Sequence, residues 1–169
     1  MLGAVVPSSS FLVKDLMNEI DWARARVIVE YGPGVGTITR EMLKRMRSDA
    51  TLLVVETNSD FVQHLRESLP DNRLKIVHGS AADVRKILAE CGLAPADYII
   101  SSIPFSFMSA AAREKILAES RLALGPQGSM LVFQYNRTIL PHLKSCFSSV
   151  RQGFQLLNIL PARIFYCTP

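Results

Sequence analysis

The stretch Val27-Ile28-Val29-Glu30-Tyr31-Gly32-Pro33-Gly34-Val35-Gly36 decides the fold, because it is an apolar run followed by a loop with three glycines. A second apolar run, residues 51–55, ends in Glu56, twenty residues past Gly36. The pattern predicts a strand, a tight turn, a helix and a second strand that ends in a carboxylate. Such a turn lets the backbone approach a nucleoside cofactor, while the carboxylate accepts hydrogen bonds from the ribose hydroxyls.

The spacing of the loop narrows the choice of cofactor. Dinucleotide-binding loops read G-x-G-x-x-G, whereas this loop reads Glu30-x-Gly32-x-Gly34-x-Gly36. The spacing resembles motif I of the class I methyltransferases that use S-adenosylmethionine (SAM). The resemblance implies that Glu30 faces the cationic methionine end of SAM, that Gly32, Gly34 and Gly36 line it, and that Glu56 binds its ribose. A dinucleotide site and a glycine turn without a ligand remain the alternatives.

The length and composition of the chain describe one ordinary domain. Its 169 residues predict a single domain over 1–169, and no apolar run approaches the roughly 18 residues that span a bilayer. The N-terminus has no basic region before an apolar stretch, so no secretory signal is expected. Cys91, Cys146 and Cys167 lie far apart without metal-type spacing, which fits free thiols in the reducing cytoplasm and predicts no metal site.

Short β-branched runs alternate with segments of helical periodicity along most of the chain. This alternation predicts an α/β domain with helices on both faces of a mostly parallel sheet. A last helix is expected over residues 141–150, and a closing antiparallel hairpin would turn at Pro161. The expected strands are residues 27–31, 51–56, 74–78, 97–101, 129–135, 155–160 and 162–167. Seven strands in this arrangement are what the Rossmann-like fold of a class I methyltransferase requires.

A third motif, Gly79 to Asp83, follows the third expected strand, where class I methyltransferases hold the adenine. Ser80 stands where such enzymes usually place an acid, so adenine contact would fall to Ser80, to the backbone near Ala81, or to Asp83. Asp83 is equally well read as the N-cap of the next helix. Ser101, at the end of the fourth strand, completes the predicted cofactor-binding residues.

The motif Ser102-Ile103-Pro104-Phe105 lies where amine methyltransferases carry Asn/Asp-x-Pro-Tyr/Phe. That motif positions an amine with a side-chain carbonyl, a backbone carbonyl and an aromatic face. The resemblance therefore implies that Ser102, Pro104 and Phe105, together with Tyr135, form the catalytic site. A serine cannot reproduce the amide that grips an adenine amino group, which weakens a nucleobase assignment. The alternative is a strand end broken by proline, with Phe105 in the core.

Three further stretches narrow the resemblance to one family: residues 3–9, 133–135 and 160–165. With residues 102–105 they resemble the bacterial phospholipid N-methyltransferases, which make phosphatidylcholine from phosphatidylethanolamine. The resemblance implies a cytoplasmic enzyme that works peripherally at the inner face of a membrane. Family members usually carry an amphipathic helix ahead of the first stretch, and this chain starts almost at that stretch. Membrane attachment is therefore expected to be weak, without a transmembrane segment.

The charges are distributed unevenly. From Ser120 to the end the chain holds five basic residues and no acid, within a net charge of +4. A surface without acids suits an anionic partner, which is phospholipid in this interpretation. Tyr135, with Arg137 or Arg163, is predicted to hold the lipid phosphate, although either arginine fits a solvated surface equally well. The alternative functions are a ribosomal RNA adenine dimethyltransferase, which would bind RNA, and a non-catalytic SAM-binding module.

Overall fold

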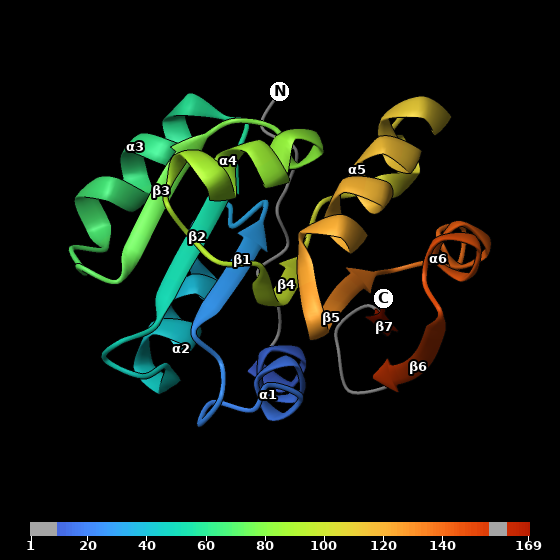
Figure 1. Cartoon of the computed structure of the whole chain (residues 1–169), viewed down its shortest axis with the longest axis horizontal. Helices are drawn as coiled ribbons and strands as arrows, with labels where there is room; N and C mark the ends of the chain where they lie inside the picture. The colour runs from blue at the N-terminus through green and yellow to red at the C-terminus, as the bar shows by residue number, and fades with distance from the viewer. Residues whose placement is uncertain (1–9, 156–161) are drawn as a thin grey trace.

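Seven strands form one sheet in the order β3-β2-β1-β4-β5-β7-β6 (Figure 1). The structure is a computed structural model and describes residues 10–155 and 162–169. The first five strands pair in parallel, and β7 lies antiparallel between β5 and β6. The strands are β1 (Val27–Tyr31), β2 (Thr51–Glu56), β3 (Leu74–His78), β4 (Ala96–Ser101), β5 (Leu124–Gln134), β6 (Ser149–Gln155) and β7 (Ala162–Thr168).

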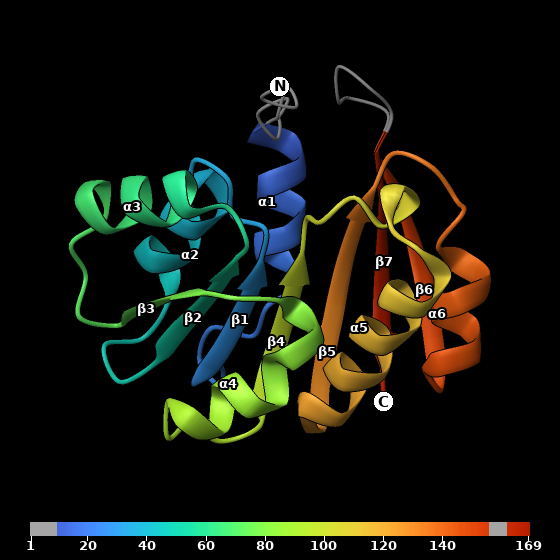
Figure 2. The same cartoon turned by 90° about the horizontal axis from the view of Figure 1, so that it is seen from above.

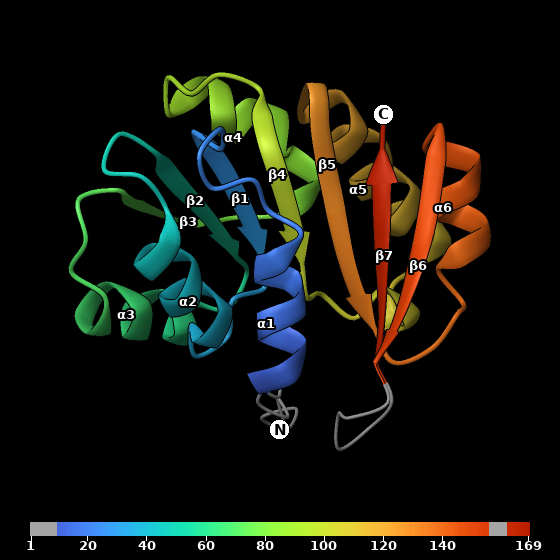
Figure 3. The same ribbon diagram turned by 90° about the horizontal axis from the view of Figure 1, so that it is seen from below.

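Helices cover both faces of this sheet (Figures 2 and 3). One face is covered by α1 (Ser10–Asn18), α2 (Thr37–Arg45) and α3 (Ser59–Ser68), and the other by α4 (Val84–Glu90), α5 (Ala110–Ala123) and α6 (Leu140–Cys146). Two short 3₁₀ turns, η1 (Ala81–Asp83) and η2 (Phe105–Phe107), follow β3 and β4. None of the helices in the described ranges is long and apolar enough to cross a bilayer.

The central strands are apolar on both sides because each face packs against helices. Successive residues of β1 alternate between the two cores: Ile28 packs with α1 and α2, and Val29 packs with α4 and α5. All five residues of β1 are buried, as expected for a strand in the middle of a doubly covered sheet. The predicted fold class is therefore confirmed.

The strand order places a topological switch point at the carboxyl edge between β1 and β4. After β1 the chain continues toward β2, and after β4 it continues toward β5, on the opposite side. The connections after the two strands therefore lead to opposite sides, and ligands of open α/β sheets bind at such a switch point. Ser101, the last residue of β4, is paired with Tyr31, the last residue of β1. The glycine loop and the motif after β4 are thereby brought side by side.

The first three strands were predicted residue by residue, and the later boundaries differ. β5 begins at Leu124 rather than Ser129, because an irregularity in the pairing with β4 takes up residues 125–128. The helix expected over 141–150 ends at Cys146, and the chain then enters β6 at Ser149. The prediction of a strand starting at Gln155 was therefore wrong. The remainder of that predicted strand and Pro161 lie outside the described residues.

Candidate functional site

The loop after β1 needs glycine at three positions. Gly32, Gly34 and Gly36 have φ values of 66°, 55° and 82°, which are left-handed conformations that side chains disfavour. Packing adds to this requirement. A Cβ on Gly32 would lie 2.7 Å from Cγ2 of Ile103, and one on Gly36 would lie 2.7 Å from Cδ2 of Leu65. Gly32 therefore lets the loop after β1 approach the loop after β4 closely.

Glu30 is a buried carboxylic acid beneath this loop. The hydroxyl of Thr39 on α2 donates a hydrogen bond of 2.6 Å to its Oε2. Its Oε1 is buried without a hydrogen-bond partner. Burial raises the pKa of Glu30 to about 8; the Thr39 hydrogen bond opposes this rise, and the nearby Glu56 adds to it. Oε1 of Glu30 is thus a buried hydrogen-bond acceptor that a cationic donor could bind.

Glu56 ends β2 and is almost fully buried. Its Oε1 accepts hydrogen bonds from the backbone N–H groups of Thr57 (2.8 Å) and Asn58 (2.9 Å). These two bonds fix the plane of the carboxylate at the carboxyl edge of the sheet. The neighbouring Asn58 accepts hydrogen bonds from the first N–H groups of α3 and so caps that helix. The loop that carries Glu56 is therefore rigidly built.

Buried polar atoms without partners occur near the carboxyl ends of the paired strands β1 and β4. Of the four such side-chain atoms in the described ranges, three are Glu30 Oε1, Ser101 Oγ and Ser102 Oγ. The backbone N–H of Ser102 donates to the carbonyl of Tyr31 at 3.1 Å, which joins the ends of the two strands. Buried polar groups are normally hydrogen-bonded, so unpartnered atoms at the ends of these strands indicate a place for a polar ligand. The carboxyl group of Glu30 and the hydroxyl group of Ser102 suit a cationic nucleoside derivative, whereas Ser101 is in register with Tyr31, on the face covered by α4 and α5.

Phe105 does not present its ring to this site. It is fully buried and packs in the core with residues of α5 and β4. Its predicted role as an aromatic face for the methyl acceptor is therefore corrected to that of a core residue, the alternative raised by the sequence. Phe107, two residues further along η2, is the aromatic residue that this loop exposes. The short 3₁₀ turn leaves one ring buried and the other exposed. The turn is too short to show a hydrophobic periodicity in the sequence, so the sequence did not predict which of the two rings would be buried.

Gln134, at the end of β5, holds the loop after β4 in place. Its Nε2 donates to the carbonyl of Ile103 at 2.8 Å, and this carbonyl also accepts from the N–H of Phe105 at 3.0 Å. With two donors already bound, the Ile103 carbonyl is poorly suited to grip an amine, whereas the Ser102 hydroxyl beside it has no partner. Sequence reasoning gave Gln134 no role. The sequence does contain one sign of a role, because Gln134 is a polar residue at the end of an apolar strand. In the structure its side chain is buried.

The loop after β3 was predicted to contact adenine. Ser80 caps η1, where its hydroxyl accepts from the N–H of Ala82 at 3.2 Å, and Ala81 is buried. Asp83 occupies the N-cap position of α4, as the alternative interpretation expected, but its side chain makes no capping hydrogen bond. It forms an exposed ion pair with Lys115 of α5 at 3.2 Å instead. Adenine contact by these residues stays a prediction.

The residues predicted to hold a phosphate lie at the same carboxyl edge. Tyr135 directly follows β5, is partly exposed, and meets Phe133 edge-on with 5.0 Å between ring centroids. Partial burial raises the pKa of Tyr135, so its hydroxyl keeps its proton at neutral pH and can donate. Arg137 is exposed two residues later, and Arg163 of β7 is paired with Gln134 in the sheet.

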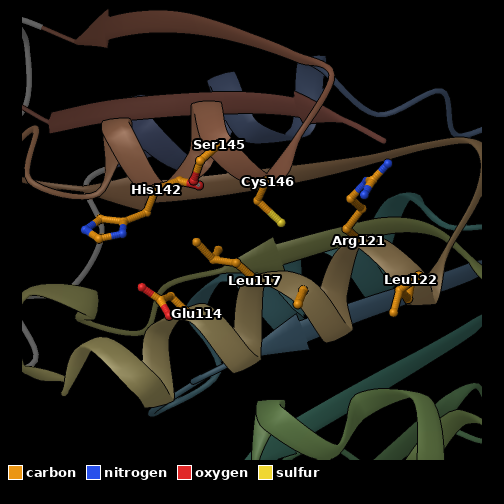
Figure 4. A pocket seen from close by; sticks show the side chains of 8 residues that line it. Glu114, Leu117, Arg121, Leu122, His142, Ser145 and Cys146 are labelled. Atoms are coloured by element: carbon orange, nitrogen blue, oxygen red, sulfur yellow. Dashed lines mark hydrogen bonds between the residues drawn. The ribbon is translucent and has the colours of Figure 1, made fainter.

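A separate cavity of about 310 Å³ lies between α5 and α6 (Figure 4). Leu117 and Cys146 point into the space between the helices, and Glu114 and His142 lie at one end of it. None of the residues predicted to bind cofactor or acceptor lines this cavity. The part of the chain that the structure describes holds no group of three or more acids, histidines and cysteines suited to a metal ion.

Comparison with known proteins identifies relatives over nearly the whole chain. The sequence model of the Methyltransferase small domain family matches residues 3–156. An ornithine lipid N-methyltransferase of Singulisphaera acidiphila is 27% identical over 172 residues, which cover 98% of this chain and 88% of that protein. A ribosomal RNA small subunit methyltransferase A of Mycoplasma capricolum is 29% identical over 102 residues, which cover 58% of this chain but 36% of that protein.

Solved structures show the same fold. The crystal structure of precorrin-6y C5,15-methyltransferase from Geobacter metallireducens superimposes with a TM-score of 0.74. The superposition covers 98% of this chain and 91% of that one, at 12% sequence identity. At this identity the likeness concerns the fold alone.

Proposed function

We propose that this chain, which belongs to the Methyltransferase small domain family and is a class I methyltransferase that uses SAM, methylates the amine of a membrane-lipid head group. The observation that carries this proposal is the similarity to an ornithine lipid N-methyltransferase, which extends over 98% of the chain. The similarity to a ribosomal RNA methyltransferase covers 58% of the chain and about a third of that protein. The similarity to the lipid-modifying relative therefore extends over more of this chain than the similarity to the RNA-modifying one, and we take the acceptor to be a lipid.

Residues at the carboxyl ends of β1, β2 and β3 support a site for SAM. Glu30, buried with one unpartnered oxygen, would accept from the ammonium group of the methionine end. Glu56, fixed by two backbone N–H groups, would bind the ribose, and the loop after β3 would face the adenine. SAM, when bound, supplies a methyl group on a positively charged sulfur, already activated for transfer to an amine. The glycines of the loop leave room for close approach.

The protein's own contribution is to position the acceptor. An amine must approach the methyl group in line with the bond that breaks, and positioning of this kind supplies much of the rate of enzymatic reactions. Ser102 has an unpartnered hydroxyl directly after β4, and Gln134 fixes the backbone of the following residue. We assign Ser102 to orienting the amine, and we assign Tyr135 to donating a hydrogen bond to the head group.

The acceptor is identified with one set of assays. Purified protein and methyl-labelled SAM are incubated with vesicles of phosphatidylethanolamine, with vesicles of ornithine lipid, and with ribosomal RNA. We expect label in at least one of the two lipids and none in RNA. Label in RNA alone would overturn the lipid proposal in favour of an RNA methyltransferase. SAM binding without transfer to any of the three would favour a non-catalytic SAM-binding module.

Glu56→Ala should weaken SAM binding strongly. The variant loses two charge-assisted hydrogen bonds to the ribose, worth together on the order of 2–3 kcal/mol, or roughly 30- to 150-fold in Kd. Isothermal titration calorimetry measures the change, and Glu67→Gln, an exposed acid on α3, serves as the control. Unchanged affinity in a folded Glu56→Ala protein would contradict the ribose assignment.

Tyr135→Phe should raise the apparent KM for phosphatidylethanolamine vesicles about 2- to 10-fold, since it removes one hydrogen bond to the head group. SAM affinity should stay unchanged, because the ring lies beyond the predicted cofactor residues. The ring itself is retained, so its packing against Phe133 is preserved. An equal loss of SAM affinity would show instead that the hydroxyl acts on the cofactor.

A further inference from the structure

Exposed apolar side chains concentrate at the carboxyl edge of the sheet. In the described ranges four large apolar residues are exposed: Val35, Phe107, Leu122 and Tyr135. Val35 follows β1, Phe107 follows β4, and Tyr135 follows β5. These three strands are parallel neighbours, so their following loops lie at one edge. Leu122, near the end of α5, directly precedes the start of β5 and so lies toward the opposite edge.

Phe107 is the most exposed of these residues, with 89% of its surface open to solvent. Large aromatic rings are normally among the more buried side chains, and clustered exposed apolar groups mark interaction sites. The ring stands on η2, between the exposed Pro104 and the N-cap of α5 at Ser109. Phe105 of the same turn is buried in the core and fixes the turn in place, so the exposed position of Phe107 is also fixed.

The three loops carry almost no charge. Residues 32–36 and 102–109 contain no acidic or basic side chain, and residues 135–139 contain one basic side chain, Arg137. Arg163 lies beside them on β7. The edge thus combines apolar tips with basic residues and, on these loops, no acid. That combination suits the interface of an anionic lipid bilayer, where apolar groups enter the head-group region and arginine meets phosphate.

We infer that this edge docks on the surface of an anionic bilayer, with the Phe107 ring inserted between lipid head groups as the main anchor. The inference rests on the proposed lipid acceptor and adds the docking face and its orientation. In this orientation the carboxyl ends of β1 and β4 face the lipid, so a head group reaches them without leaving the membrane. RNA fits the edge less well, because RNA-binding surfaces follow the phosphates with many cations.

Vesicle binding by matched variants tests the docking face. Phe107→Ser and Leu122→Ser each remove one exposed apolar side chain, from opposite edges of the sheet. Binding is measured by co-sedimentation with vesicles of phosphatidylcholine containing 30% phosphatidylglycerol. Phe107→Ser should weaken binding about 10-fold, whereas Leu122→Ser should change it less than 2-fold. Equal binding by the two variants, or no binding by the wild-type chain, would overturn the inference.

Insertion of the ring is tested independently by fluorescence. Trp22, the single tryptophan, is replaced by phenylalanine, and tryptophan is introduced at position 107 or 122. The emission of the Phe107→Trp protein should shift to the blue with these vesicles and be quenched by brominated lipids, while that of the Leu122→Trp protein should not. Both responding alike would contradict insertion at the carboxyl edge.

Activity separates this inference from the proposed function. Phe107→Ser should methylate monomeric short-chain phosphatidylethanolamine at the wild-type rate and lose turnover on vesicles about 10-fold. If the wild-type chain methylates neither form, the lipid acceptor fails, whatever the vesicle binding shows. If both proteins use both forms equally, the acceptor stands and the Phe107 anchor fails. Tighter binding to RNA than to vesicles, lost in Phe107→Ser, would reassign the edge to RNA.

Discussion

Phe105→Ala is expected to destabilise the protein by about 3–5 kcal/mol, because it empties the space of a fully buried ring. SAM affinity and turnover should fall together, since the loop after β4 would lose its attachment to the core. Urea denaturation measures the stability change, with calorimetry and turnover on the same samples. This expectation differs from the sequence-based one, in which the ring served the acceptor and turnover alone would fall.

Phe107→Ala is the matched control for that experiment. It removes the same side chain two residues away, where the ring is exposed, and should change the free energy of unfolding by less than about 0.5 kcal/mol. If Phe105→Ala instead keeps wild-type stability and SAM affinity while turnover falls, the ring does face the acceptor. In that case the core assignment is wrong.

Glu30→Gln is expected to stabilise the protein increasingly as pH rises. In the unfolded chain the carboxyl group ionises near its ordinary pKa of 4.5, while burial keeps it protonated in the folded state until about pH 8. Between these values the unfolded state binds fewer protons, so wild-type stability falls as pH increases. The loss attributable to Glu30 is on the order of 3 kcal/mol between pH 5 and pH 8, at about 1.4 kcal/mol per unit of pKa shift.

Urea denaturation of both proteins across this pH range measures the effect, as a stability difference that grows from pH 5 to pH 8. Glu67→Gln on the exposed face of α3 is the control and should show no growing difference. The same Glu30→Gln variant should bind SAM more weakly, most clearly above pH 8, where the wild-type carboxylate is charged. A difference that stays constant with pH would contradict a buried, protonated Glu30.

Most of the fold was predictable because its signals are local. The three glycines, the acids that end the apolar runs and the alternation of periods each depend on neighbouring residues. Prediction from the sequence failed where pairing with a distant strand decides the conformation of a short segment. Residues 147–150 read as the end of a helix, but pairing with β7 makes residues 149–155 the strand β6. Propensity alone does not reveal that a partner strand is available.

For the site, the sequence by itself determined which residues stand at strand ends: Glu30 before the glycine loop, Glu56 after β2 and Ser102 after β4. Only the tertiary structure decided that β1 and β4 lie side by side, that Gln134 reaches the carbonyl of Ile103, and that Phe105 is buried while Phe107 is exposed. The physical reason is that exposure and hydrogen bonding depend on what packs across from a residue. For this edge, the groups that pack together come from strands separated by many tens of residues in the chain.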